Sequence, residues 1–157
     1  MCTAYGEKVV HVKPHGALYN IAAVNPGIAE VIAKAVRAID PKLILYGLSG
    51  SELIRAGERL GLTVAHEVFA DRTYQPNGLL TPRTEPNAMI IDVELALERV
   101  FEMICNGKTT ATNGRVIPLK ATTICVHGDE PQALLFVERL RRFLQEKKVS
   151  LKAVNTE

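Results

Sequence analysis

The stretch Val9-Val10-His11-Val12-Lys13-Pro14-His15-Gly16-Ala17-Leu18-Tyr19-Asn20 begins as a β-branched run and ends in ionisable residues. Pro14 and Gly16 mark the break between the two parts, and Pro14 favours an extended conformation for the residue before it. We therefore expect a strand that delivers Lys13 and His15 to a tight turn. Strands that end in this way present reactive groups at the mouth of an α/β fold.

The same pattern recurs twice further along the chain. Residues 64–68 lead into Phe69-Ala70-Asp71-Arg72, and residues 123–127 lead into Gly128-Asp129. In barrels and open α/β sheets, ligands bind at the C-terminal ends of the strands. Three strands that end in charged residues therefore predict one site assembled from strand ends.

The first half of the chain alternates between strand and helix patterns. We expect a strand over residues 8–13, buried on both faces apart from His11, and further strands over residues 43–46 and 62–68. Asn25 and Pro26 begin a helix that Asp40-Pro41 ends. Its inward face is predicted to carry Ile28, Val31, Ile32, Ala35, Val36 and Ile39. Residues 49–52 have capping-box spacing and open a second helix, which Gly61 ends.

The second half begins with a long polar segment over residues 70–87, a length typical of functional loops. A helix over residues 93–104 follows, and then a hairpin with a type I′ turn at Asn113-Gly114 that interrupts the βα order like an insertion. A strand over residues 122–127 and a weaker one over 149–153 flank a last helix, capped by residues 129–132. The inner face of that helix is predicted to carry Leu134, Val137, Leu140 and Leu144.

This order predicts an α/β fold with a parallel sheet and helices outside it. About five strands are too few for a closed eight-stranded barrel, which typically needs about 250 residues. An open sheet and a piece of a barrel both remain possible. We expect a single domain over residues 1–157, since the chain of 157 residues is long enough to bury a sizeable core.

Composition limits the classes of partner. A net charge of +2 without a dense Lys/Arg stripe argues against nucleic acid and membrane surfaces as partners. The three cysteines, Cys2, Cys105 and Cys125, lie far apart and predict neither a disulfide framework nor a zinc site. Without a leader pattern or a run long enough to span a membrane, a cytoplasmic location is expected.

The ionisable residues at the predicted strand ends form the candidate site. They supply cations, carboxylates and imidazoles, a set suited to activating a carbonyl or phosphoryl group and a water molecule. They are Lys13, His15, Glu67, Asp71, Arg72, His127 and Asp129. Structural alternatives stay open: Asp71 and Arg72 as a local ion pair, Asp129 as a helix cap, and Lys13 as a solvated strand end. No motif assigns a metal ligand.

Several blocks of the sequence together resemble the LamB/YcsF family. They are residues 11–20, Glu67-Val68-Phe69-Ala70-Asp71-Arg72-x-Tyr74, the block from Leu80 to Asp92, and Cys125-Val126-His127-Gly128-Asp129-x-Pro131. The Asp/Asn-rich first strand of the family and its Gly-Phe-His-Ala-Gly and Gly-Ala-His-Pro stretches are not present. The chain therefore resembles the C-terminal two-thirds of the family. We expect parallel βα units forming part of a distorted TIM-type (β/α)7-like barrel that lacks the N-terminal strands, either as a fragment or completed by association.

The resemblance implies ATP-dependent opening of the 5-oxoproline lactam to L-glutamate, using ATP and Mg²⁺ in concert with the other 5-oxoprolinase subunits. On this basis Lys13, His15, Glu67, Asp71, Arg72 and His127 are predicted to be catalytic, and Tyr19, Asn20, Arg83 and Asp129 to bind substrate. Our hypothesis is that Lys13 and Arg72 neutralise developing charge, Glu67 or Asp71 acts as a base, and His15 or His127 carries the proton to the leaving nitrogen. A homo-oligomer is also compatible with this picture.

Two other functions remain open. One is a deacetylase-like carbohydrate hydrolase that uses a metal bound by strand-end His and Asp residues. The other is a truncated, non-catalytic scaffold that binds partner subunits. Stoichiometric zinc in the purified protein would favour the first, and turnover of 5-oxoproline and ATP with and without partners would test the second.

Overall fold

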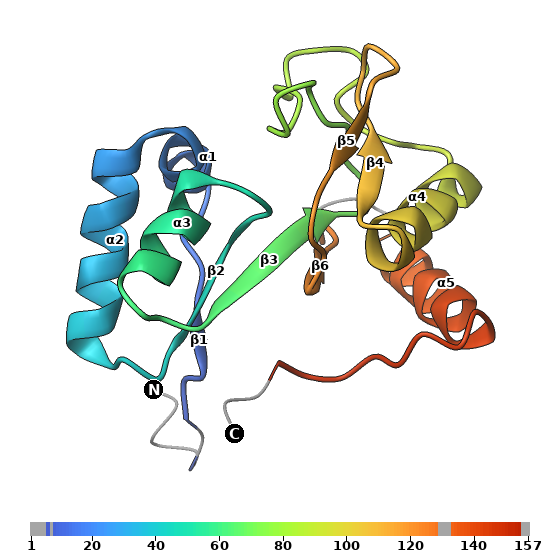
Figure 1. Cartoon of the computed structure of the whole chain (residues 1–157). Coiled ribbons are helices and arrows are strands. Elements are labelled where there is room, and N and C mark those ends of the chain that lie inside the picture. Colours follow the sequence, from blue (N-terminus) through green and yellow to red (C-terminus); the bar gives the residue numbers. More distant parts are fainter. Residues whose placement is uncertain (1–5, 7, 129–132, 155–157) are drawn as a thin grey trace. The chain divides into compact units, whose positions relative to one another are not determined.

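The computed structural model describes residue 6 and residues 8–128 and 133–154, which fall into two compact units (Figure 1). Unit 1 runs up to His66 and includes Val154, and unit 2 comprises Glu67–Ala153. Strand β3 (Val64–Phe69) begins in unit 1 and ends in unit 2. The single domain expected over residues 1–157 stays a prediction.

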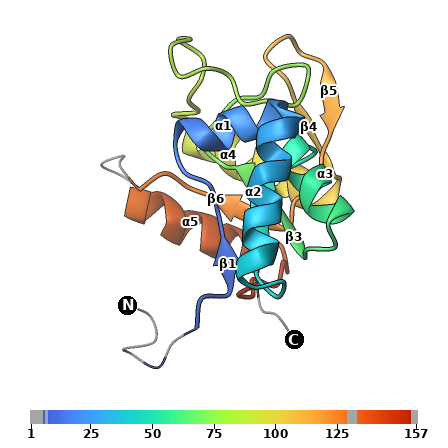
Figure 2. The same ribbon diagram turned by 90° about the vertical axis from the view of Figure 1, so that its left-hand side faces the viewer.

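Unit 1 is built from short parallel strands and three helices. It contains β1 (His11–Val12), α1 (Ala17–Val24), α2 (Pro26–Ile39), β2 (Ile44–Leu48) and α3 (Glu52–Arg59). Strand β1 pairs in parallel with β2, His11 opposite Ile44, and Leu45 of β2 donates its N–H to the carbonyl of Thr63 just before β3. Figure 2 shows α2 running alongside β1.

Small side chains line the core of unit 1, which lets the helices approach one another closely. Its buried members are Ala22, Ala29, Ala33, Val36, Leu43, Leu45, Leu53, Ala56 and Leu62. The predicted inward face of α2 is therefore wrong in part. Val36 is buried and Ile32 packs against the core as predicted, but Ile28, Val31 and Ile39 are exposed, and Ala29 and Ala33 take the other buried positions. The predicted start of α2 is confirmed: Asn25 accepts the N–H of Ile28 at 3.0 Å and Pro26 follows it.

Three further expectations for unit 1 need correction. Strand β1 is shorter than residues 8–13, and Val9 and Val10 are 56% and 36% exposed, because β1 lies at an edge of the described sheet. Helix α1 was not predicted at all. The N-cap of α3 is Ser51, whose Oγ accepts the N–H of Ile54 at 3.4 Å, and not the first residue of the predicted capping box at residues 49–52.

Unit 2 continues the parallel sheet. The end of β3 pairs in parallel with β6 (Thr123–Cys125), with Glu67 opposite Thr123 and Phe69 opposite Cys125. Helices α4 (Val93–Cys105) and α5 (Ala133–Glu146) pack together through Leu97, Val100, Leu140 and Leu144. The predicted parallel α/β class is confirmed by the strand order β1-β2-β3-β6. No helix in the described ranges is long and apolar enough to cross a membrane.

The antiparallel hairpin β4 (Lys108–Thr110) and β5 (Val116–Pro118) is confirmed, but its turn differs from the predicted one. A type I′ turn needs positive φ at both central residues, and here Gly114 has φ 83° whereas Asn113 is not in that region. Gly114 donates its N–H to Ala111 at 2.9 Å, and Ala111 donates to Arg115 at 2.8 Å. This pattern is a β-turn over residues 111–114 that ends in a left-handed glycine, so the loop between Ala111 and Arg115 has three residues and not two.

The C-terminal part of unit 2 departs from expectation in two places. Residues 149–153 form no strand, and Leu134 and Val137 are 74% and 44% exposed, so the predicted inner face of α5 is wrong at these two residues. Leu140 and Leu144 are buried as predicted, and Phe136 and Phe143 pack against the same cluster in their place. The predicted cap at residues 129–132 lies outside the described residues.

Candidate active site

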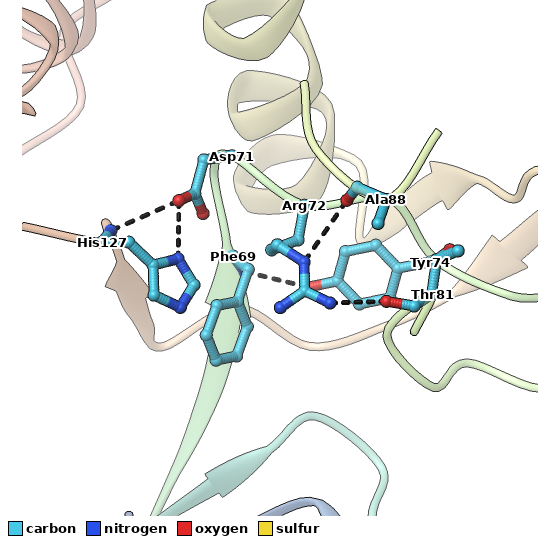
Figure 3. A network of polar contacts seen from close by, with 7 residues as sticks. All are labelled: Phe69, Asp71, Arg72, Tyr74, Thr81, Ala88 and His127. Carbon is cyan, nitrogen blue, oxygen red and sulfur yellow. Dashed lines mark hydrogen bonds and ion pairs between the residues drawn. The ribbon is translucent and has the colours of Figure 1, made fainter. Parts of the chain in front are cut away.

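Asp71 and His127 form the central pair of the candidate site, at the ends of two neighbouring strands of unit 2 (Figure 3). Asp71 Oδ2 lies 2.6 Å from His127 Nδ1 and also accepts the backbone N–H of His127 at 3.3 Å. The Asp71 side chain is 12% exposed and that of His127 is 22% exposed. An ionised Asp71 places the imidazole proton on Nδ1, and Nε2 is then the nitrogen that can accept or donate a proton.

The surroundings of this pair restrict the imidazole further. The ring of Phe69 stacks beside that of His127, with the two centroids 5.6 Å apart and the planes 28° apart. Asp71 Oδ1 is buried and has no hydrogen-bond partner within the described part of the chain. A buried carboxylate oxygen with spare capacity is costly unless a bound group uses it. Asp71 Oδ1 can therefore accept one hydrogen bond more than the described residues supply.

Arg72 points away from Asp71 and ties the long loop together instead (Figure 3). Its Nε donates to the carbonyl of Ala88 at 3.3 Å, and an Nη donates to the carbonyl of Thr81. Burial lowers the pKa of this guanidinium from its ordinary value, nearby Arg83 lowers it further, and Asp71 partly opposes both. The local ion pair of Asp71 with Arg72 that the sequence left open is therefore not formed among the described residues.

Tyr74 fixes the end of β3 from the other side. Its hydroxyl oxygen accepts the backbone N–H of Phe69 at 2.9 Å, and the side chain is only 1% exposed. Burial raises the pKa of Tyr74 above its ordinary value, so the hydroxyl stays protonated over the working range of pH. Ile90 adds a backbone bond to the carbonyl of Asp71 at 2.9 Å. Tyr74, near the start of the loop, and Ile90, near its end, thus both bond to the backbone around Asp71.

The other predicted residues of unit 2 are placed as follows. Glu67 is 3% exposed and lies within β3, two residues before Phe69. Arg83 is exposed on the loop, close enough to Arg72 to affect its pKa. Asp129 lies outside the described residues. Unit 2 therefore brings Asp71 and His127 into direct contact, while Arg72 supports the loop that follows them.

The remaining predicted residues belong to unit 1. The Lys13 ammonium lies over the ring of Tyr19, 5.4 Å from its centroid, and Tyr19 is 5% exposed on α1. His15 and Asn20 are exposed near the start of α1. The left-handed φ of 61° at Gly16 directs the chain from the Lys13 strand into this helix. Lys13 and Tyr19 thus form one cluster within unit 1.

The residues can be tested for their fit to a phosphate or a metal ion. Lys13 is an exposed cation at a strand end, and this type of group fits a phosphate oxygen. Arg72 is less suited to that role, because two of its nitrogens already donate to carbonyls. In the described ranges no three His, Cys, Asp or Glu side chains gather closely enough to hold a metal ion.

Phe69, Tyr74 and Thr81 are site residues that we did not assign from the sequence. Phe69 and Tyr74 do lie in the block from Glu67 that carries the family resemblance, so a signal for them existed. Thr81 contributes through its carbonyl and through its hydroxyl, 2.7 Å from that of Thr73. Nothing in a single sequence distinguishes these threonines from others in a polar loop.

Comparison with known proteins agrees with this architecture. The chain matches the LamB/YcsF family over residues 1–157. It is 58% identical over 154 residues to a protein of Halalkalibacterium halodurans that is named as the A component of 5-oxoprolinase, covering 98% of this chain and 60% of that protein. It is 48% identical over 152 residues to the protein of the same name from Bacillus subtilis, covering 97% and 59%.

A solved structure is similar over nearly the whole chain. The lactam utilization protein from Thermus thermophilus superimposes with a TM-score of 0.87 at 37% sequence identity, covering 97% of this chain and 60% of that one. The chain thus spans about 60% of the length of the relatives it matches. A match over all 157 residues, together with the identity to several curated relatives, shows that the chain belongs to the LamB/YcsF family.

Proposed function

We propose that this chain carries the proton-transfer part of a 5-oxoprolinase, the lactam-opening enzyme for which its relatives are named. The observation that carries the proposal is the 2.6 Å contact between Asp71 Oδ2 and His127 Nδ1. A carboxylate that holds one imidazole nitrogen leaves the other poised for acid–base chemistry. The names of the relatives support the reaction class, and the geometry of this pair supports a proton-transfer role for His127.

Lactam opening requires balanced proton movement. Water adds its oxygen to the C5 carbonyl carbon, the bond from C5 to the ring nitrogen breaks, and the nitrogen gains a proton to become the amine of glutamate. His127 Nε2 can take a proton from the attacking water and deliver it to the leaving nitrogen. Asp71 stabilises the imidazolium formed between these two steps, which is the usual role of such a carboxylate.

The lactam itself is resonance-stabilised, and its oxygen needs activation before water attacks. ATP with Mg²⁺, held in concert with partner subunits, would supply the phosphoryl group for that activation and leave as ADP. After water has added and the bond from C5 to the nitrogen has broken, the phosphoryl group would remain on the new carboxyl group until a second water molecule releases it as inorganic phosphate. Lys13 is the described residue best suited to neutralise charge on such an oxygen, because its ammonium is exposed at a strand end. Glu67, His15, Tyr19, Asn20, Arg83 and Asp129 stay proposed contributors whose individual roles await substitution.

Reconstitution with the partner subunits tests the proposal. We expect the complex that contains this chain to form glutamate from 5-oxoproline and ATP. The Lys13→Ala variant should lose about 10²–10³-fold in turnover, the typical effect of removing one charge-stabilising group. Turnover that is unchanged in Lys13→Ala would count against Lys13. A complex that assembles fully but never turns over would favour the scaffold alternative, and stoichiometric zinc would favour the deacetylase-like one.

A further inference from the structure

The two faces of the β3–β6 strand pair in unit 2 carry different kinds of side chain. One face packs against the apolar cluster of α4 and α5 through Ala70, Ile124 and Val126. Side chains alternate along a strand and the residue that follows it, so the residues between these three point to the opposite face. The residues of that opposite face are Phe69, Asp71, Cys125 and His127.

Phe69 supports the imidazole of His127 on this opposite face (Figure 3). The two ring centroids are 5.6 Å apart and the ring planes differ by 28°. The parallel pairing of Phe69 with Cys125, two positions before His127, sets which residue of β3 meets the imidazole. The Tyr74 hydroxyl accepts the N–H of Phe69 at 2.9 Å, and Phe69 is only 4% exposed. The phenyl ring is therefore a fixed support for the imidazole.

The contact with Asp71 alone leaves the imidazole one freedom. Asp71 Oδ2 fixes the position of Nδ1 at 2.6 Å, but a single hydrogen bond tolerates some tilting of the ring about that contact. Tilting moves Nε2, which lies on the far side of the ring. A displacement of about 1 Å at a reacting group can cost on the order of 10²-fold in rate. Stacking on a fixed phenyl ring limits the tilt, because the two planes must stay close to parallel.

The face of Phe69 also suits the charged form of His127. Proton transfer by His127 passes through an imidazolium, and a cation within about 6 Å of the centroid of an aromatic ring is attracted by the negative face of that ring. The separation of 5.6 Å meets this condition, and the His127 side chain is only 22% exposed. A leucine at position 69 would fill much of the same space but would offer neither a flat face nor this attraction.

We propose that Phe69 is a positioning residue for proton transfer, which holds the plane of the His127 imidazole and stabilises its charged form. The inference rests on the proposed function, since it concerns the same proton steps. Phe69 acts through His127 and touches no reacting atom itself. A phenylalanine that only fills space would affect stability but neither the order of the His127 ring nor the turnover of a folded complex, so the two roles can be separated.

NMR relaxation of the His127 ring in the full chain tests the positioning part without any turnover. Histidine labelled with ¹³C and ¹⁵N provides the signals, and His127→Gln identifies the one from His127. We expect a ring order parameter of about 0.85 in the wild type, as in rigid backbone, and below about 0.6 in Phe69→Leu. Phe69→Tyr keeps the aromatic face and should restore the order. Phe143→Leu, which removes an aromatic ring from the α4–α5 cluster, should leave the order unchanged.

Turnover of 5-oxoproline by the reconstituted complex tests the catalytic part. Phe69→Leu should lower kcat about tenfold to hundredfold and keep KM within about twofold, because lost orientation weakens the transition state and not substrate binding. Phe69→Tyr should recover most of kcat, and Phe143→Leu should keep wild-type turnover.

Two results would overturn the inference. One is a His127 ring that stays ordered in a folded Phe69→Leu chain. The other is wild-type kcat in Phe69→Leu while His127→Gln is inactive in the same complex. Wild-type turnover in His127→Gln would instead overturn the proposed function, and the order of the ring in the chain would then still decide whether Phe69 holds the imidazole.

Discussion

Asp71 holds His127 through a single carboxylate oxygen, which lies 2.6 Å from the ring Nδ1 and accepts the backbone N–H at 3.3 Å. The two residues are 56 positions apart in sequence and meet because β3 and β6 are parallel neighbours. One oxygen therefore sets both the position of the β6 strand end and the tautomer of its imidazole. Rotation of His127 would break at least one of these bonds.

The first prediction concerns the tautomer of His127. In Asp71→Ala, no acceptor remains for the proton on Nδ1, so the neutral imidazole should move its proton from Nδ1 to Nε2. Ring ¹⁵N shifts of His127 measure this directly. Glu85→Gln, an exposed carboxylate in the same loop, should leave those shifts unchanged. The same tautomer in wild type and Asp71→Ala would argue against the assigned hydrogen bond.

The second prediction concerns Tyr74 and alkaline pH. Tyr74→Phe leaves the buried Phe69 N–H without an acceptor, so it should lower the free energy of unfolding by about 1–3 kcal/mol at neutral pH. The pKa of Tyr74 is raised in the folded state from its ordinary value of 10.0, so above pH 10 the unfolded chain binds fewer protons than the folded one. Stability then falls as pH rises.

The difference between wild type and Tyr74→Phe isolates this effect, because other tyrosines titrate in both proteins. That difference should shrink by up to about 1.4 kcal/mol for each pH unit above 10. Urea unfolding at several pH values between neutral and strongly alkaline provides the measurement. A difference that stays constant above pH 10 would mean that Tyr74 titrates normally in the folded protein.

The third prediction concerns Arg72 as a tie for the long loop. Lysine cannot donate to the Ala88 and Thr81 carbonyls at once with fixed fork geometry, so Arg72→Lys should lower the free energy of unfolding by about 1–3 kcal/mol. Limited proteolysis should then cut within residues 72–90 faster than in the wild type. Arg115→Lys, exposed on the hairpin, serves as the control and should show wild-type cleavage. Equal cleavage of both variants would contradict the bracing role.

The fourth prediction tests the packing of unit 1 at Gly57. A Cβ placed there would lie 2.6 Å from Val64 Cγ1 and 3.1 Å from Leu45 Cδ2. Overpacking costs about 1–3 kcal/mol, which exceeds the gain in helix propensity of about 1 kcal/mol from replacing a glycine. Gly57→Ala should therefore lower the free energy of unfolding, whereas Gly128→Ala, with nothing near its Cβ, should change it little. A more stable Gly57→Ala protein would contradict this prediction and would show that Val64 and Leu45 can move aside at little cost in free energy.

The sequence predicted the parts of the fold that local chemistry dictates. Asn25-Pro26 begins a helix because a cap side chain and a proline satisfy its first turn, and the structure confirms this start. The predicted inward face of α2 was wrong at Val31 and Ile39, which are apolar yet exposed. The residues next to them in the sequence do not indicate that alanines pack inside instead. The spacing of apolar residues predicts that a helix forms more readily than it predicts which side of the helix packs against the rest of the protein.

The candidate site shows the same division between local and distant information. The strand-end rule selected Asp71 and His127, and the structure brings these two into contact. Arg72 was selected by the same rule for a charge-neutralising role, but its partners are carbonyls 9 and 16 residues away. Every residue has a backbone carbonyl, so the sequence does not indicate which carbonyls an arginine will bind. An arginine that braces a loop therefore cannot be distinguished from a catalytic one by sequence alone.

The most direct test of the central claim is glutamate formation by the reconstituted complex carrying His127→Gln. Glutamine keeps a polar side chain at the strand end but cannot transfer a proton, so turnover should fall by about 10²–10⁴-fold while complex assembly is preserved. Glu85→Gln in the same assay should retain wild-type turnover. Turnover within about twofold of wild type in an intact His127→Gln complex would contradict the assignment of proton transfer to the Asp71–His127 pair.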